Sequence, residues 1–502
     1  MTAILRKCFI GFVILNLIDC GGTTVSDQST VLLPVENDPT VSFRLWFKVG
    51  SQDDPMGKEG LAYITAAMLT EGSTESRDYE EIVDALYPLA ADYQSQCHIE
   101  QTVIAGRVHR DHLDDYYDLL TDAVLHPAFK QDDLNRIKKQ TRNYLENLLR
   151  YSSDEELGKA ALYQFIYRGT PYGHVPYGTV KSVQSITLED VRQFYRQHFT
   201  RENVVIGLGG GYQGSLVIRL RDDLAELPDG EVSTPPVPRP EPIRGRQVFI
   251  VEKDANATAI SIGFPIDILR GSREWYALAL ANSWFGEHRQ TNSHLFQVIR
   301  DDRGLNYGDY SYIERYPGGG SRTKPPQNVS LRQQVFEIWI RPVPNETRHF
   351  ALRAAIRELQ YLVEHGLSEE DFNLTQQFFG KYVLHYAPTT MARLGYALDD
   401  TFYGIDGSHL DNLRTIIPDL SREEVNRAVR KYLRFENLKI AVVTENAGEF
   451  KQALISDQIS PIEYSSPKPD EILDEDKLIM EYPLNIREEA VEIVPVEQMF
   501  EE

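Results

Sequence analysis

Two side chains of the segment SHLFQVIRDDRGLNY, residues 293–307, carry hydrogen-bond donors that could bind an oxyanion. Arg300 and Tyr307 lie seven residues apart. A guanidinium donates several hydrogen bonds in a fixed fork, and a phenol adds one more donor. Donors aimed at a developing oxyanion lower the barrier of acyl transfer, by about 3–4 kcal/mol where one has been removed. The simpler interpretation is structural, with Arg300 ion-paired to Asp301 or Asp302 and Tyr307 packed in a strand.

An apolar segment, GLAYITAAMLTEGS at residues 60–73, predicts one short buried helix. Its apolar side chains recur at helical spacing and form one face: Leu61, Ile64, Thr65 and Met68. Gly60 precedes the helix, and Gly72 stands where a helix commonly ends in a left-handed turn. On its residues alone the segment is a core helix, as most apolar periodic helices are.

The residues around this helix make it more informative. An apolar strand at 41–49 and a polar loop through Gly57 precede it. Strand, loop and helix together resemble the opening of the pitrilysin/insulinase-like (M16, inverted-zincin) metallopeptidases, where the helix reads G-L-A-H-x-x-E-H-M-x-x-x-G-[ST]. Alignment of the flanking GLA and M…GS places His-x-x-Glu-His on the five residues Tyr63, Ile64, Thr65, Ala66 and Ala67. Both histidines and the glutamate are missing.

The chemistry of the replacements predicts that this chain holds no catalytic zinc and no catalytic residue of its own. A catalytic zinc needs about three protein ligands and one open position. Tyr63 is a poor ligand, with a side-chain pKa near ~10, Ala67 has no donor atom, and Ala66 cannot act as the general base. The family's third ligand is a glutamate some seventy-odd residues further on, which Glu146 matches as a remnant. No two of the chain's histidines are four residues apart.

The segment 293–307 also resembles the family, through its pattern S-x-L-F-x-x-[LI]-R-x-x-x-G-L-x-Y. In complete enzymes an arginine and a tyrosine at this spacing face the zinc site across an internal chamber. They bind the substrate backbone and help to stabilise the tetrahedral intermediate. The resemblance therefore implies that Arg300 and Tyr307 are substrate-binding residues of a site whose metal lies elsewhere.

An internal repeat indicates that the chain consists of two similar halves. Residues 187–206 align without a gap on residues 421–440, at an offset of 234. Both copies open with a capping box, Thr187 with Asp190 and Ser421 with Glu424. Each continues as an amphipathic helix, a Glu-Asn pair and an apolar strand, which is typical of duplication.

The sequence predicts an α+β fold with two tandem homologous pitrilysin-like domains, each a mainly antiparallel sheet covered by helices. A proline-rich stretch separates the halves and reads as a semi-rigid linker. An acidic stretch with aliphatic pieces follows the second half and predicts an ordered strap. The boundaries are residues 1–20 for a signal peptide, 29–228, 229–245 for the linker, 246–446, and 447–502 for the strap.

Composition and the first residues bound the partners and the compartment. A net charge of −23 argues against nucleic acid, and 42% hydrophobic residues over 502 positions indicate a globular protein. Arg6 and Lys7 precede an apolar run too short to span a bilayer. The sequence around Cys20, LIDCGG, resembles a bacterial lipobox, although Asp19 departs from it. A lipid anchor on the periplasmic side of a bacterial envelope is predicted, with a plain cleaved signal as the alternative.

These observations give three functional hypotheses. Complete members of the family use four such domains, in one chain or in a pair of chains, and in pairs one chain can carry the zinc motif and the other the arginine and tyrosine. The first hypothesis is therefore a non-catalytic subunit of a heteromeric zinc metallopeptidase, whose partner carries His-x-x-Glu-His and which binds peptide. The second is a pseudo-peptidase that only binds or scaffolds. The third, an active zinc endopeptidase, lacks the necessary ligands.

Overall fold

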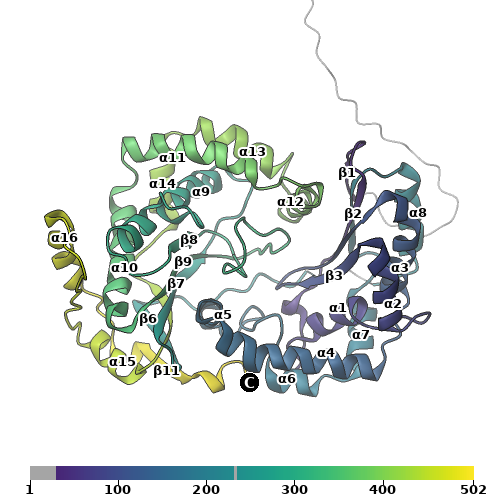
Figure 1. The fold of residues 1–502 in the computed structure, drawn as a ribbon, viewed down its shortest axis with the longest axis horizontal. Coiled ribbons are helices and arrows are strands. Elements are labelled where there is room, and N and C mark those ends of the chain that lie inside the picture. The colour runs from purple at the N-terminus through teal and green to yellow at the C-terminus, as the bar shows by residue number, and fades with distance from the viewer. Residues whose placement is uncertain (1–29, 231–233) are drawn as a thin grey trace, which may run out of the picture.

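The computed structural model describes residues 30–230 and 234–502, and these form two lobes that lie side by side (Figure 1). Each lobe is built on one mixed sheet. The first sheet has the order β1-β5-β2-β4-β3. Its strands are β1 (Thr30–Pro34), β2 (Thr40–Phe47), β3 (Asp92–Cys97), β4 (Thr102–His109) and β5 (Val204–Gly210).

The second sheet repeats this order and adds one strand, giving β11-β6-β10-β7-β9-β8. Its strands are β6 (Arg246–Glu252), β7 (Ala257–Ile266), β8 (Asp309–Tyr312), β9 (Gln334–Pro344), β10 (Leu438–Thr444) and β11 (Val491–Pro495). Within the two sheets, only the pairs β1–β5, β6–β10 and β6–β11 are parallel. The predicted α+β class with mainly antiparallel sheets is confirmed.

The internal repeat coincides with the secondary structure. Helix α7 (Leu188–His198) leads into β5, and α14 (Arg422–Tyr432) leads into β10 at the same offset. Both capping boxes form: the backbone N–H of Asp190 donates to the Thr187 hydroxyl at 3.2 Å, and that of Glu424 donates to the Ser421 hydroxyl at 3.3 Å. The two halves are therefore copies of one fold.

Helices cover the outer face of each sheet and enclose one large apolar core per half. The first half contributes α1 (Leu61–Thr70), α2 (Tyr79–Leu86), α3 (Leu113–Leu125), α4 (Gln131–Asn143), α6 (Val180–Ser185), α7 and α8 (Gly214–Leu224). The second half contributes α9 (Arg273–Gly286), α10 (Arg348–His365), α11 (Glu369–Tyr382), α13 (His409–Ile416) and α14. None of the helices within residues 30–230 and 234–502 combines the length and the apolar character needed to cross a bilayer.

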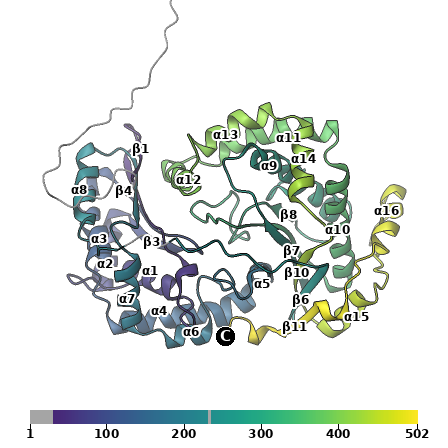
Figure 2. The ribbon, with the colours of Figure 1, turned by 180° about the vertical axis from the view of Figure 1, so that it is seen from behind.

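Two helices are exchanged between the halves. Helix α5 (Asp154–Tyr167) of the first half packs on β7 and β10 of the second sheet, and α12 (Thr390–Tyr403) of the second half packs on β1, β2 and β5 of the first. The ring centroids of Phe165 and Phe249 lie 5.5 Å apart, and those of Trp46 and Phe402 lie 6.0 Å apart. Both inner faces are therefore covered by the opposite half, which holds the lobes together (Figure 2).

The C-terminal residues cross from the second half back to the first. Helices α15 (Ala447–Ile455) and α16 (Asp470–Met480) lie on the second half, and β11 then extends its sheet beside β6. Beyond β11, the Arg150 Nε donates to the Met499 carbonyl at 2.9 Å, and the Val180 N–H donates to the Phe500 carbonyl at 2.8 Å. The predicted signal peptide and Cys20 lie outside the described residues.

Candidate functional site

The helix that aligns with the zinc-binding helix of the family is α1, and its start is fixed by a buried carboxylate. Gly60 adopts a left-handed conformation at φ 94° directly before the helix. Asp54 accepts hydrogen bonds from the backbone N–H groups of Gly60 at 2.6 Å and Ala62 at 2.7 Å, and His174 lies 3.1 Å from the same carboxylate. The left-handed turn predicted at Gly72 is wrong, because among the described residues only Gly60 of this pair has a positive φ.

A tyrosine cluster occupies the side of α1 where the first zinc ligand is expected. The rings of Tyr63 and Tyr177 meet edge to face with centroids 4.6 Å apart, and the Tyr144 ring packs on Tyr177 at 4.2 Å with the two planes tilted by 39°. Burial raises the pKa of Tyr63 above its ordinary value, so the phenolate needed for metal binding is disfavoured. Ala66 and Ala67 are fully buried in the core.

The residues present do not fit a zinc ion. Neither alanine offers a donor atom, and among residues 30–230 and 234–502 there is no cluster of three metal-ligating side chains. Glu146 lies on the π-helical segment Tyr144–Ser152, where its carboxylate accepts a hydrogen bond from Arg142 at 2.7 Å. The side chain of this segment that reaches the cluster is Tyr144, two residues earlier and therefore on a different face of the helix.

Arg300 and Tyr307 lie together in the second half. Arg300 is the last residue but one of the π-helical segment Phe296–Asp301, and its guanidinium carbon is 5.9 Å from the centroid of the Tyr307 ring. Tyr307 is 78% exposed. Within the described part of the chain, Arg300 forms no ion pair with Asp301 or Asp302, and its positive charge acts on the buried carboxyl of Asp309 from beyond ion-pair distance. Arg303 is the arginine of this segment that is ion-paired, to Glu475 and Asp476 of α16.

A cavity of about 450 Å³ lies between the two halves, next to the tyrosine cluster. The first half contributes the end of β3, the π-helical segment, α5 and the loop around Tyr177, and the second half contributes residues 315–322. Neither Arg300 nor Tyr307 lines it. Cys97 does, as a free thiol whose pKa burial raises to about 12, so it is not a nucleophile at neutral pH.

Of the charged side chains that line this cavity, some have an ion-pair partner and others do not. Lys159 of α5 lies 3.7 Å from Glu337 and 4.4 Å from the centroid of the Tyr312 ring. Burial raises the pKa of Glu337. Arg315 has no carboxylate within ion-pair distance among the described residues, and its Nη1 lies 3.3 Å from Nδ1 of His98. Burial lowers the pKa of His98 well below its ordinary value, so this imidazole is neutral.

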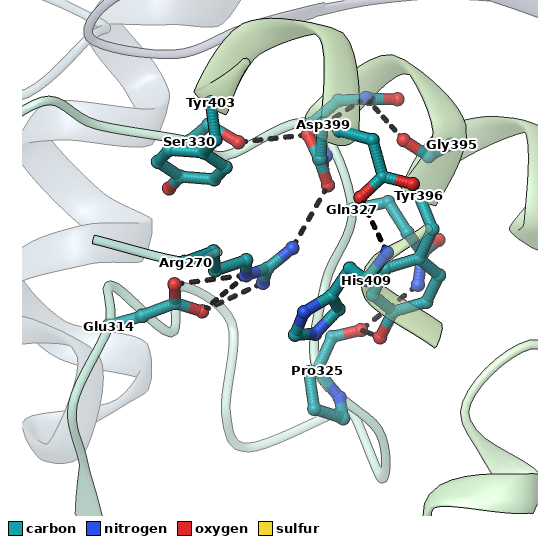
Figure 3. A network of polar contacts seen from close by, with 12 residues as sticks. Arg270, Glu314, Pro325, Gln327, Ser330, Gly395, Tyr396, Asp399, Tyr403 and His409 are labelled. Carbon is teal, nitrogen blue, oxygen red and sulfur yellow. Dashed lines mark hydrogen bonds and ion pairs between the residues drawn. The ribbon is translucent and has the colours of Figure 1, made fainter. Parts of the chain in front are cut away.

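A network of buried polar contacts lies beside the cavity. Arg270 donates to Glu314 at 2.7 Å and lies 3.6 Å from Asp399 of α12 (Figure 3). Asp399 also accepts hydrogen bonds from the Asn328 backbone N–H at 3.1 Å and the Ser330 hydroxyl at 2.9 Å. Because Arg44 of β2 donates to Asn328 as well, the network joins the first sheet to the second half.

Comparison with known proteins gives the class that this fold and this altered helix define. A family model for insulinase, peptidase family M16, matches residues 30–179, and one described as the peptidase M16 inactive domain matches residues 185–378. The chain therefore belongs to the M16 peptidase family. Since α1 carries none of the ligands and the second half matches the inactive domain, it is a non-catalytic member.

Individual relatives agree with the family, and their names include both zinc proteases and a non-peptidase homologue. The chain is 24% identical over 300 residues, 59% of its length and 71% of the relative, to the "Uncharacterized zinc protease YmxG" of Bacillus subtilis. It is 23% identical over 418 residues, 81% of its length and 89% of the relative, to the "Non-peptidase homolog YmxG" of Helicobacter pylori. A peptidase M16 inactive domain from Pseudomonas fluorescens shares the fold, with a TM-score of 0.73 at 22% identity over 84% of this chain and 98% of that one.

The sequence did not single out the residues that line the cavity. Tyr144, Tyr177 and Arg315 come from three distant segments, and no motif connects them. The one signal was the loop that begins at Tyr316, whose glycines and prolines suggest a turn beside a binding path. Only the exchange of α5 and α12 brings these segments together.

Proposed function

We propose that this chain is the non-catalytic subunit of a heteromeric M16 zinc metallopeptidase, in which Arg300 and Tyr307 contact the peptide substrate. One observation carries the proposal: the pair is adjacent, Tyr307 is 78% exposed, and Arg300 has no ion-pair partner among the described residues. An arginine and a tyrosine held for structural reasons are usually paired inside the protein, as Arg303 is. The partner subunit would carry His-x-x-Glu-His and its zinc.

The proposed role follows from the chemistry of the two side chains. The Arg300 guanidinium and the Tyr307 hydroxyl would donate hydrogen bonds to the peptide backbone and to the carbonyl oxygen as negative charge develops on it. In the assembled complex, the partner subunit would place the scissile bond of the peptide next to these two side chains. We further propose that the chain is held at the periplasmic side of a bacterial envelope by a lipid on Cys20, as its lipobox-like sequence suggests.

The first experiment is a pull-down of the tagged mature chain from its native envelope, with identification of the proteins that co-purify. A stoichiometric protein with His-x-x-Glu-His supports the proposal. The second experiment measures peptide turnover of that complex with Arg300→Ala and Tyr307→Phe. We expect turnover to fall about 100-fold or more for the arginine variant, with assembly intact on gel filtration. Unchanged turnover would refute the role of the pair.

A second candidate function is a pseudo-peptidase that binds a ligand or acts as a scaffold without any peptidase partner. The cavity of about 450 Å³ favours it, because it is formed by this chain alone. An eluate that contains only this chain would move the conclusion to this candidate.

A further inference from the structure

Arg315 follows β8 directly after a bend at Ile313 and Glu314, and the side chains of Glu314 and Arg315 have different environments. Glu314 turns toward Arg270 and is neutralised by a two-pronged ion pair, in which Arg270 Nε and Nη2 donate at 2.9 and 2.7 Å. Arg315 lines the cavity between the halves. Its backbone N–H donates to the Gln334 side chain at 3.1 Å, which ties this part of the segment to β9.

The Arg315 guanidinium has no carboxylate within ion-pair distance among the described residues, and the carboxylates of Glu156 and Glu337 act on it only from farther away. Its side chain is half-buried, and burial lowers its pKa, because the charged form is less well solvated there than in water. Its side-chain contacts among residues 30–230 and 234–502 are Nη1 with the neutral His98 at 3.3 Å and the Tyr163 ring, 5.9 Å away. An arginine that stays charged in such a site is stabilised most simply by an anion that enters the cavity.

The other charged groups that line the cavity do not fill this role. Glu156 of α5 accepts hydrogen bonds from the backbone N–H groups of Gly318 at 3.2 Å and Gly320 at 3.3 Å, and thereby holds the loop that forms one wall. Lys159 is opposite Glu337. Arg322 is exposed and also lines the cavity, where it adds a second positive charge that attracts anions.

The side chains that line the cavity indicate the chemistry of the rest of the ligand. Five tyrosine rings line the cavity: Tyr144, Tyr163, Tyr172, Tyr177 and Tyr316. The Tyr163 hydroxyl is buried and has no hydrogen-bond partner among the described residues, so its donor is not used within this part of the protein. An aromatic enclosure with a few convergent polar groups is the usual form of a ligand site, and a volume of about 450 Å³ lies in the usual range.

We propose that this cavity binds a carboxylate carried on an aromatic or apolar body, with Arg315 as the anchor of the carboxylate and the tyrosines as the walls around the body. Arg315 forms the charged hydrogen bonds, and the Tyr163 hydroxyl donates to the second carboxylate oxygen. The carboxylate can belong to the end of a peptide or to a small aromatic acid. The site is complete within one chain, so it depends on neither the peptidase partner nor the roles of Arg300 and Tyr307.

The test is calorimetric titration of the purified mature chain with matched acids and amides. The probes are 3-phenylpropionate with 3-phenylpropionamide, and N-acetyl-Ala-Ala-Phe with its C-terminal amide. We expect at least one acid to bind 10-fold or more tightly than its amide, and Arg315→Gln to abolish that preference. Arg315→Lys, which keeps the charge without the fork, should retain part of it. Arg110→Gln, at an exposed arginine beyond the far end of β4, should leave it unchanged.

Each outcome either supports or overturns the proposal, and the supporting outcomes also identify the class of ligand. Preference for the peptide acid alone identifies a chain end, and preference for both acids identifies a general aromatic carboxylate site. Equal binding of acid and amide by the unaltered chain, or no binding of any of the four probes at millimolar concentration, overturns the proposal. This comparison needs no variant, so it stands even where Arg315→Gln fails to fold. Loss of Arg300 and Tyr307 function in the complex would leave the result untouched.

Discussion

The edge of the Tyr63 ring meets the face of Tyr177 with centroids 4.6 Å apart, at the helix where the family carries its zinc motif. Where the family carries a metal site, this chain has a contact between aromatic rings. Tyr144 extends the cluster, and Ala66 and Ala67 pack into the core behind it. The helix itself is retained, with its N-terminal N–H groups capped by the buried Asp54. The fold has therefore kept the position of the site while its interior has been rebuilt.

Restoring the motif with Tyr63→His, Ala66→Glu and Ala67→His should not restore zinc binding. Position 66 is fully buried in the core, and a glutamate there costs several kcal/mol unless it is paired. The third ligand is also missing, since Tyr144 and not Glu146 reaches the cluster. We expect a chain that is less stable by about 3 kcal/mol or more and free of metal, as measured by thermal unfolding and elemental analysis. Stoichiometric zinc with peptide cleavage would contradict this.

Two arginines three residues apart should contribute very unequally to stability. Arg303 is fully enclosed and bonds Asp476, Glu475 and the Val298 carbonyl, each at 2.7–2.8 Å. Arg303→Met leaves Asp476 buried without its partner and should cost about 3–5 kcal/mol. Arg300→Met, the matched control, removes no ion pair of the described residues and should change stability far less, by about 1 kcal/mol or below, since it loses a contact with the exposed Tyr307 and a longer-range attraction to Asp309. Urea midpoints of the two variants compare them directly, and equal losses would show that α16 is not held through Arg303.

The sequence predicted the repeated part of the fold well because that part is local. The capping boxes, the amphipathic helices and the apolar strands that follow are determined by residues within one stretch of about 20 positions. The structure places α7 with β5, and α14 with β10, at the predicted offset. The strand and the helix around the altered zinc motif could be predicted for the same reason, because residues within one short stretch determine them.

The rest depends on contacts that sequence patterns do not encode. The exchange of α5 and α12 could not be predicted, because the apolar pattern of a helix does not specify which sheet it packs on. Glu146 was matched only by its distance along the sequence from the motif, whereas the segment is π-helical and orients its side chains differently from an α-helix. Glu314 and Arg315 are neighbours in sequence, but Glu314 is ion-paired to Arg270 whereas Arg315 lines the cavity. The sequence does not distinguish these two environments.

Stability should depend on pH through Glu287, which lies buried at the end of α9. Burial raises its pKa to about 7 from the ordinary value of 4.5. Because the folded state binds this proton more tightly than the unfolded state, the contribution to stability is complete below pH 4.5 and is lost as the pH rises through 7. Glu287→Gln stays neutral, so it should gain stability relative to the unaltered chain between pH 5.5 and 8, by up to about 3 kcal/mol.

Differential melting of the two proteins across this pH range measures the effect. Burial shifts His288, the next residue, in the opposite sense, since its pKa falls to about 4. It is present in both proteins and cancels in the difference. A constant difference in melting temperature from pH 5.5 to 8 would show that Glu287 does not titrate in this range.

The exchanged helices predict that the halves stay together after the connection between them is cut. Phe165 of α5 packs against Phe249, and the buried Lys439 of β10 donates to the Phe165 carbonyl. A protease site inserted after Pro236, in a stretch without helix or strand, should give a nicked chain that elutes from gel filtration at the intact size. Phe165→Asp places a charge in this interface and should release the halves after cleavage. Halves that separate without that substitution would show that the exchange contributes little to their association.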